Sequence, residues 1–260
     1  MISALNAAAS GMEAQQNQIE QIANNLSNVQ TTGYKRSRAE FQDLMYETLQ
    51  EPGANTSALT QSPVGIQRGV GVKVSGTQRN FESGAPLHTQ RDMDMMVRGE
   101  GFFVVQIPTG EMGFRRDGSF HKSAIGRIET IDGYPIQPEM IIPAGAQRVE
   151  ISEDGVVNAV MSDTERSQIG QIQLATFVNN GGLKAIGKNL YVATAASGAP
   201  NFNQPTQNGT GGIMHHYLEG SNVDVVKEMV GMISAQRAYE MNSKVLQTVD
   251  QIMQHTVNVK

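Results

Sequence analysis

Residues 2–28 read ISALNAAASGMEAQQNQIEQIANNLSN and contain one glycine and no proline, so they set the helical part of the fold. Eight positions recur at alternating steps of three and four, which is the spacing of a coiled-coil seam: Ile2, Leu5, Ala9, Met12, Gln16, Ile19, Ala23 and Leu26. We predict a helix that runs to about Asn28 and breaks at residues 31–33.

The polar face of this predicted helix carries amides in place of charges. Between residues 1 and 33 the only charged side chains are Glu13 and Glu20, whereas ten positions are Asn or Gln. A solvated helix face usually mixes Glu and Lys, which pair with one another four residues apart. Amides form hydrogen bonds without the desolvation cost of a charge. The composition therefore favours burial of this face against other protein surfaces.

The other end of the chain repeats the pattern. Ser221 and Asn222 are the predicted N-caps, and Asp224 lies in the first turn, where a negative charge complements the helix dipole. Steps of four and three then connect Val225, Met229, Met232, Gln236, Tyr239, Ser243, Leu246, Asp250, Met253 and Val257. The two seams could close on each other as an antiparallel hairpin, or be completed by neighbouring copies, and the charge-poor amide face favours the second alternative.

The middle of the chain predicts strands. All nine prolines fall between residues 52 and 205, and short alternating apolar runs are separated by Gly and Pro from about residue 68 to 220. Residues 102–105, FFVV, predict a strand buried on both faces. Asp-Gly pairs at 117–118, 132–133 and 154–155 are signals of hairpin turns. The predicted class is α+β, with long terminal helices in a coiled-coil-like domain and a central antiparallel all-β domain.

These patterns divide the chain into three parts. We expect a helical assembly domain at 1–33 and 221–260, a connecting segment at 34–67 and the β domain at 68–220. In the connecting segment, Phe41, Leu44, Met45 and Leu49 recur at helical spacing. Residues 51–66 show no strong periodicity and predict an extended loop, and loops of that length in compact proteins are usually functional or mobile.

The composition excludes several kinds of chemistry. The absence of cysteine excludes disulfides, cysteine-ligated metals and cysteine nucleophiles. A net charge of -5 argues against nucleic-acid binding. No GxSxG elbow, HExxH helix or phosphate-binding loop occurs, and the adjacent His215 and His216 would point to opposite faces of a strand. We expect no enzyme activity, no cofactor and no catalytic, cofactor-binding or metal site.

The N-terminus predicts no ordinary export route. It has no basic region followed by an apolar run, and no segment approaches the roughly 18 apolar residues of a membrane span. We expect no membrane insertion and no cleaved signal peptide. Taken alone, this predicts a cytoplasmic protein.

Four motifs resemble a known family. Residues 24–35, NNLSNVQTTGYK, are similar to the N-terminal signature of bacterial flagellar axial proteins, the rod and hook family. Residues 99–103 (GEGFF), 116–120 (RDGSF) and the pattern from Ser221 to Lys244 resemble further family motifs in the same order. The resemblance implies an assembly signature at Asn24, Asn25, Leu26, Asn28, Thr32, Gly33, Tyr34, Gln236, Arg237, Tyr239 and Asn242. Within the signature, we expect the helix exit to require a positive φ at Gly33.

Length and residues 41–54 are most similar to the distal-rod members, with a proximal-rod or hook subunit as the alternative. The resemblance implies a subunit that is exported unfolded through the flagellar export apparatus and polymerises into a rigid hollow drive shaft across the periplasm. This shaft transmits torque from motor to hook. The implied partners are further copies of the chain, proximal-rod subunits below, hook or hook-junction subunits above, and the surrounding P and L ring proteins. The resemblance thus reverses the cytoplasmic prediction.

The segment 51–66 is the candidate for rod stiffness, through Glu51, Pro52, Gly53, Ala54 and Pro63. An extended loop that reaches a neighbouring subunit would resist sliding between them. Two alternatives from other classes remain open. One is a periplasmic hydrolase with a coiled-coil anchor, and the other is a monomeric coiled-coil adaptor.

Overall fold

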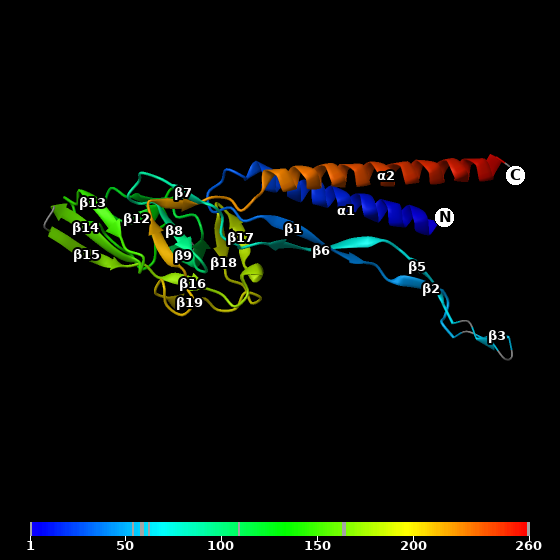
Figure 1. Cartoon of the computed structure of the whole chain (residues 1–260), viewed down its shortest axis with the longest axis horizontal. Coiled ribbons are helices and arrows are strands. Elements are labelled where there is room, and N and C mark those ends of the chain that lie inside the picture. Colours follow the sequence, from blue (N-terminus) through cyan, green and yellow to red (C-terminus); the bar gives the residue numbers. More distant parts are fainter. Residues whose placement is uncertain are drawn as a thin grey trace. The chain divides into compact units, whose positions relative to one another are not determined.

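The computed structural model describes residues 2–53, 55–57, 60–61, 63–108, 110–162 and 165–258 (Figure 1). It is an α+β chain with one long helix near each end and a largely β region between them. Two compact units emerge from its backbone contacts. The helical unit comprises Met1–Ser27, Ser37–Gln78 and Asp224–Lys260, and the β unit comprises Asn28–Arg36 and Arg79–Val223.

The helical unit contains α1 (Ile2–Ser27) and α2 (Val225–Asn258), which lie side by side and antiparallel, with the two chain ends at the same end of the pair (Figure 1). Small residues mark where the helices approach closely. A Cβ added at Gly11 would lie 2.9 Å from the Asn242 side chain, and one at Gly231 would lie 3.4 Å from Ile22. The prediction of terminal helices is confirmed, and α1 ends one residue before the predicted position.

The faces that these helices bury differ from the predicted seams. In α1 the predicted positions Ala9, Gln16 and Ala23 are exposed. The positions that are buried are Ala8, Ala14, Ile22 and Asn25 in α1 and Glu228 and Ala235 in α2. Several residues of the predicted α2 seam are likewise exposed, namely Val225, Met229, Gln236 and Tyr239. Periodicity defines stripes along a helix, but the partner present decides which neighbouring stripe becomes buried.

The described residues between 37 and 79 form a paired ribbon, in a stretch for which helical spacing and a loop were predicted. Its ladders pair β1 (Ser37–Asp43) with β6 (Val72–Arg79), β2 (Tyr46–Gln50) with β5 (Ile66–Gly69), and β3 (Asn55–Ser57) with β4 (Thr60–Gln61). The helical interpretation of Phe41, Leu44, Met45 and Leu49 is therefore wrong, and the described part of 51–66 is not structureless. Pairing with distant residues supplies the hydrogen bonds here, and local spacing does not report such partners.

The ribbon also explains why the units divide the chain differently from the ranges expected from the sequence. Residues 72–78 were expected in the β domain, but they pair with β1 inside the helical unit. The backbone N–H of Val72 donates to Ser10 Oγ of α1 at 3.3 Å. This end of the ribbon is thus attached to α1.

The β unit is built around a six-stranded antiparallel sheet. Its order is β17 (Lys184–Gly187), β18 (Leu190–Val192), β10 (Met112–Arg115), β9 (Phe102–Gln106), β16 (Leu174–Thr176) and β19 (Asn201–Asn203). A three-stranded sheet joins β13 (Arg148–Ile151), β14 (Val156–Ser162) and β15 (Glu165–Gln171). The remaining pairs are β11 (Phe120–Lys122) with β12 (Ile128–Thr130), β8 (Met95–Arg98) with β20 (Gly212–His215), and β7 (Pro86–His88) with β21 (Tyr217–Glu219). A short 3₁₀ helix spans Asn180–Gly182.

Strand β9 lies between two hydrophobic clusters. Phe103 and Val105 belong to one, and Phe102 and Val104 to the other. All four side chains are at most 2% exposed, so the predicted strand buried on both faces is confirmed.

Two of the three predicted turns reverse the chain. Ser152 and Val156 pair across Asp154-Gly155, and Thr130 and Tyr134 pair across Asp132-Gly133. Asp117-Gly118 instead lies in the short connection between β10 and β11, which do not pair with each other, so that prediction is wrong. A Cβ at Gly118 would come within 1.6 Å of the Met95 carbonyl oxygen. Glycine is therefore required here because the backbone of Met95 lies so close. An Asp-Gly dipeptide alone does not show whether its glycine is needed for such a contact or for a turn.

Candidate functional site: a buried junction and an exposed helix face

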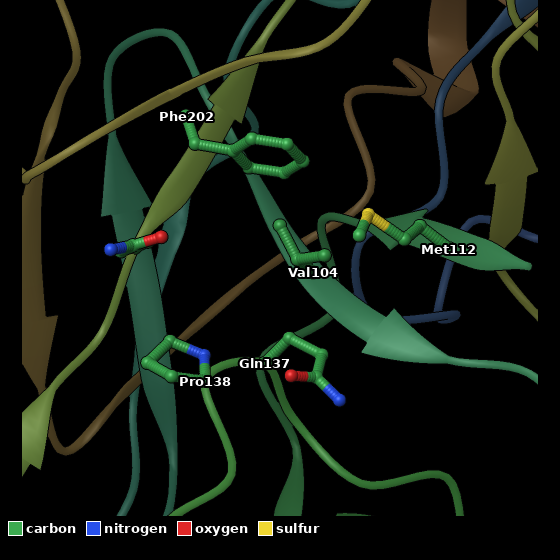
Figure 2. A pocket seen from close by; sticks show the side chains of 6 residues that line it. Val104, Met112, Gln137, Pro138 and Phe202 are labelled. Carbon is green, nitrogen blue, oxygen red and sulfur yellow. The ribbon is translucent and has the colours of Figure 1, made fainter.

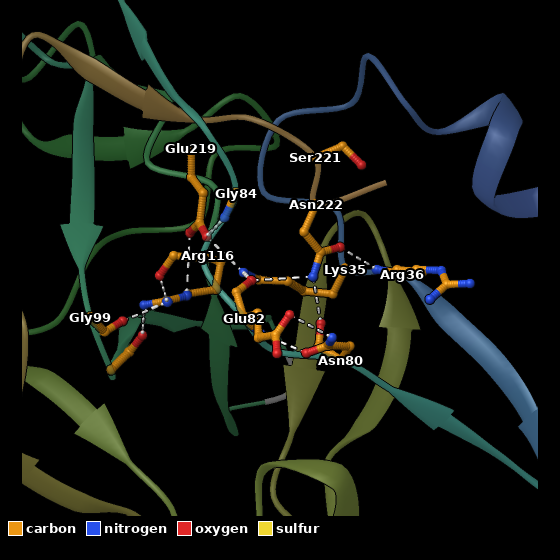
Figure 3. A network of polar contacts seen from close by, with 12 residues as sticks. Lys35, Arg36, Asn80, Glu82, Gly84, Gly99, Arg116, Glu219, Ser221 and Asn222 are labelled. Carbon is orange, nitrogen blue, oxygen red and sulfur yellow. Dashed lines mark hydrogen bonds and ion pairs between the residues drawn. The ribbon is translucent and has the colours of Figure 1, made fainter. Parts of the chain in front are cut away.

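A buried carboxylate at the end of β21 organises a polar junction in the β unit (Figure 3). The Glu219 carboxylate accepts hydrogen bonds from Lys35 Nζ at 2.7 Å and from the Gly84 backbone N–H at 2.9 Å. Its second oxygen forms an ion pair with Arg116 Nε at 3.3 Å. The side chains of Lys35 and Glu219 are both 0% exposed. Charge-assisted contacts of this kind are strong when water is excluded.

Arg116 connects this carboxylate to the six-stranded sheet. Its terminal nitrogens donate to the carbonyl oxygens of Gly99 and Gly101, both at 2.6 Å. Its guanidinium lies 5.7 Å from the ring centroid of Phe102, a cation–π distance. Two family motifs, GEGFF and RDGSF, thus meet at one side chain.

Asn222 connects three segments of the same junction (Figure 3). Its Oδ1 accepts from the Arg36 backbone N–H at 2.7 Å, and its Nδ2 donates to the carbonyl oxygens of Asn80 at 2.9 Å and Glu82 at 3.2 Å. The prediction that Ser221 and Asn222 cap α2 is therefore wrong. Asp224 is the N-cap, since its Oδ1 accepts from the backbone N–H groups of Val226 and Lys227.

The last residues of the N-terminal signature, which follow α1, are bound at the same polar junction. Thr32 Oγ1 donates to Asp117 Oδ1 at 3.1 Å, and the Gly33 N–H donates to the Glu219 carbonyl oxygen at 2.7 Å. Gly33 has a φ of 68°, which is the left-handed conformation predicted for it. A Cβ there would lie 2.5 Å from the Asp117 backbone nitrogen. Both the backbone conformation and the space therefore require glycine.

The junction gathers motifs that are far apart in the sequence, but its central ion pairs were not predicted. Lys35 and Arg116 each lie inside a motif that was recognised, and Glu219 lies two residues before another. The sequence does set Lys35 apart in one way, because it is the first basic residue after a long stretch without Lys or Arg. No local pattern indicates that Glu219 is its partner.

Two buried cations share one buried carboxylate, and this shifts the pKa of Lys35. Its pKa is lowered from 10.5 to about 8, first by burial and next by the nearby Arg116 charge. The Glu219 carboxylate opposes this shift but does not cancel it. Burial likewise lowers the pKa of Arg116 from its usual value. The folded state therefore disfavours the protonated form of Lys35, and keeping this form buried lowers the free energy of unfolding.

We expect the free energy of unfolding of the β unit to rise by up to about 2 kcal/mol between about pH 8 and about pH 9.5. The pKa of Lys35 is about 8 when folded and 10.5 when unfolded, so between these values the unfolded chain holds a proton that the folded chain has released. Raising the pH therefore favours the folded state. Urea unfolding at several pH values measures the slope, and Lys35→Met should abolish the rise. A stability that falls across this window in the unsubstituted chain would contradict the assignment.

A second buried polar cluster lies inside the helical unit, at Asn25. Its Nδ2 donates to the Ser37 carbonyl oxygen at 2.8 Å and to Glu228 Oε2 at 3.3 Å, and its Oδ1 accepts from the Ser37 N–H at 3.0 Å. Asn25 and Glu228 are 1% and 2% exposed. One signature amide thus links α1, α2 and β1.

The other predicted assembly residues are dispersed. Asn24, Gln236, Arg237 and Tyr239 are exposed, whereas Leu26, Asn28, Tyr34 and Asn242 are half-buried, with Asn242 next to Gly11 of α1. In the predicted stiffening segment, Glu51, Pro52, Gly53 and Pro63 are exposed, and Ala54 lies outside the described residues.

One face of α2 exposes large apolar side chains. We define the outer α2 face as Val226, Met229, Val230 and Ile233, which are 70%, 52%, 59% and 50% exposed. These residues recur at helical spacing on the side of α2 opposite to the buried Glu228 and Ala235. Exposed apolar faces of this kind are typical of protein interaction surfaces.

The β unit also contains a shallow apolar groove of about 170 Å³ (Figure 2). It is lined by Val104, Met112, Gln137, Pro138, Gln173 and Phe202, none of which is ionisable. Among the residues that the structure describes, no group of three or more His, Asp or Glu side chains is arranged to hold a metal ion. Within the same residues, neither helix is long and apolar enough to cross a membrane.

Three family models match separate parts of the chain. "Flagella basal body rod protein" matches residues 5–35, "Flagellar hook protein FlgE/F/G D1 domain" matches 96–159, and "Flagellar basal body rod FlgEFG protein C-terminal" matches 214–259. The first and last matches include the signature residues around Asn25 and the outer α2 face. The central match includes Arg116.

Full-length relatives are similar over nearly the whole chain. A protein of Caulobacter vibrioides is 46% identical over 259 residues, which cover 99% of both chains. One of Borreliella burgdorferi is 42% identical over 263 residues, covering 100% of this chain and 99% of the relative. One of Bacillus subtilis is 36% identical over 266 residues, covering 100% of both. All three are named flagellar basal-body rod protein FlgG.

Proposed function

The chain belongs to the flagellar basal-body rod protein family, and from that premise we propose how it assembles and works. It is a structural subunit of the distal rod. Copies join through their terminal helices into a helical, hollow polymer, and torque passes from motor to hook through the repeated contacts. The chain has no catalytic role.

The exposed outer α2 face is the observation that carries this proposal. Its four apolar side chains are at least half exposed in the single chain. Removing such surface from water contributes roughly 25 cal/mol for each Å² buried, so a neighbouring copy that covers this face gains stability at every contact. The amide-rich surface of α1 supports the same proposal, since amides can be buried against protein at a lower cost than charges.

Sedimentation and electron microscopy of the purified chain test this proposal. The full-length chain should form long straight polymers, whereas chains that lack residues 2–27 or 224–260 should remain single subunits. Far-ultraviolet circular dichroism should show helicity rising on polymerisation, because the apolar face that α2 exposes in the single chain gains a partner, and tertiary packing supplies most of a helix's stability. A full-length chain that never polymerises, or a truncated chain that still does, would contradict the proposal. The adaptor alternative predicts no polymer in any of these samples.

We propose that the signature residues contribute to assembly in two ways, some by holding the helical unit together and others by contacting a neighbouring copy. Asn25 holds α1, α2 and β1 together within the helical unit. Gln236, Arg237 and Tyr239 are exposed on α2 and are available to a neighbouring copy. The partners would be further copies of the chain, proximal-rod subunits, hook or hook-junction subunits, the surrounding P and L ring proteins and the flagellar export apparatus.

The chain is a component of the flagellar basal body. We further propose that it reaches the periplasm through the flagellar export apparatus. A chain threaded unfolded into an oxidising space benefits from having no cysteine to form wrong disulfides.

The ribbon is our candidate for rod stiffness. Exposed apolar side chains lie in and next to its β2–β5 ladder: Met45 at 88%, Val64 at 71%, and Tyr46, Leu49 and Ile66 at 53–54%. A paired ribbon resists bending better than a single extended strand, because two backbones are joined by hydrogen bonds. Contacts between this surface and a neighbouring copy would oppose sliding between subunits.

Deleting residues 51–65 should give polymers that are more flexible or curved than those of the full-length chain. Gln50 and Ile66 are paired in the ladder, so an Asn-Gly turn can close the shortened ribbon without disturbing β2 and β5. Persistence length measured on electron micrographs reports the change. A milder pair, Val64→Ser with Ile66→Ser, separates the effect of side chains from that of ribbon length. An unchanged straight rod in the deletion would show that the ribbon does not confer stiffness.

A further inference from the structure

We propose that Glu219 locks together the two segments by which the chain enters and leaves the β unit, so that each is held more firmly when the other is in place. We call residues 28–36 the entry segment and residues 217–223 the return segment. The proposal rests on the proposed function in one respect: it concerns the free subunit, before assembly gives the terminal helices their partners. The lock would hold both helix attachments at fixed places on the β unit during that stage.

Three contacts join the entry segment directly to the return segment. Lys35 Nζ donates to the Glu219 carboxylate at 2.7 Å, and the Gly33 N–H donates to the Glu219 carbonyl oxygen at 2.7 Å. The Arg36 N–H donates to Asn222 Oδ1 at 2.7 Å. Each contact disappears if either segment leaves the β unit. The binding of one segment therefore favours the binding of the other by the same free energy in both directions.

Charge makes the coupling strong. Lys35 and Arg116 are both buried, and Glu219 is the buried carboxylate between them (Figure 3). The other carboxylates close to these cations, Glu82 beside Lys35 and Glu100 beside Arg116, belong to exposed residues. Without the return segment, the two cations would repel each other in a site poor in water. Leaving a buried charge without its partner is strongly destabilising.

Arg116 is the fixed part of the lock. It is held by the carbonyl oxygens of Gly99 and Gly101 and by Ser83 Oγ, none of which belongs to the entry or return segment. The Gly84 N–H, which also binds Glu219, likewise belongs to neither segment. The sheet thus presents a preformed cationic site. Glu219 occupies this site and in doing so creates the site for Lys35.

Hydrogen exchange measured by mass spectrometry on the free full-length chain tests the lock. Glu219→Gln keeps the shape of the side chain and removes its charge. Amide exchange should become at least tenfold faster in the return segment and also in the entry segment, whereas β9 and β10 should remain protected. The Lys35→Met substitution lies in the entry segment. Because the coupling is reciprocal, exchange in the return segment should also become faster, by several-fold. This second variant keeps the Arg116–Glu219 ion pair, so it provides the test if Glu219→Gln does not fold.

Glu150→Gln is the matched control. Glu150 also lies between two basic side chains, with Arg148 at 3.1 Å and Arg166 at 3.5 Å, but on the surface of the three-stranded sheet. Exchange in the entry and return segments should not change in this variant, because solvated ion pairs contribute little. The lock is refuted if either test variant loosens only the segment that carries the substitution, or loosens neither. Failure of polymerisation would instead contradict the proposed function, since exchange is read on free subunits.

Discussion

A Gly33→Val chain should lose about 3 to 5 kcal/mol of unfolding free energy in the β unit and should fail to polymerise. Valine at a φ of 68° is strained, because its branched Cβ collides with its own backbone in the left-handed region. Its Cβ would also lie 2.5 Å from the Asp117 backbone nitrogen, which a side-chain movement does not relieve. The entry segment must therefore shift away from Asp117 and Glu219. Urea unfolding and sedimentation measure the two effects.

The β unit itself should remain folded in this variant, since typical domains are stable by about 5 to 15 kcal/mol and its hydrophobic clusters are untouched. Gly133→Val is the matched control. Gly133 lies in the same unit with a φ of 81°, but a Cβ there meets nothing within 4 Å. The control incurs the backbone strain without the collision and should polymerise. If both variants behave alike, the contact with Asp117 has no role in assembly.

Charges placed on the outer α2 face should abolish the polymer. In a Val230→Glu, Ile233→Glu chain, every subunit contact made by this face would bury two carboxylates without partners, at a cost of several kcal/mol. That cost recurs at each contact along the rod, so long polymers should be absent in electron micrographs and in sedimentation. The α1–α2 pair should survive in the single chain, because both substitutions lie away from the buried Ala235 and Glu228.

Val178→Glu provides the comparison for that experiment. Val178 is 90% exposed in the β unit, so the substitution adds a carboxylate to an exposed apolar position outside the helices. Polymers of normal length are expected. Normal polymers from the doubly substituted α2 would show that subunits do not meet through the outer α2 face, and the proposed assembly would then need another surface.

Local patterns predicted the elements that depend on local physics. The absence of proline and the scarcity of glycine in residues 2–28 predicted α1, and the FFVV run predicted that β9 is buried on both faces. The positive φ of Gly33 was predicted from its place after a helix. In each case the residues that form the element also carry its signal, since helix propensity, continuous hydrophobicity and glycine's freedom act within a few residues.

Elements whose partners are distant in the sequence were missed or misread. Phe41, Leu44 and Met45 have helical spacing, yet they lie along a ribbon whose second strand comes some thirty residues later. Asn222 has the chemistry of a helix cap, but it bridges Arg36, Asn80 and Glu82. A side chain that can form several kinds of hydrogen bond takes the one that the folded chain offers.

The sequence by itself determined that helices lie at both ends of a β-rich chain without cysteine, and its motifs indicated the family. The tertiary structure alone decided which helix faces are buried, that strands β1 to β6 pair as a ribbon, and that Lys35, Arg116 and Glu219 meet. The physical reason is the range of the interactions. A helix forms through bonds four residues apart, whereas Lys35 and Glu219 are 184 residues apart and are brought together only by the fold of the strands between them.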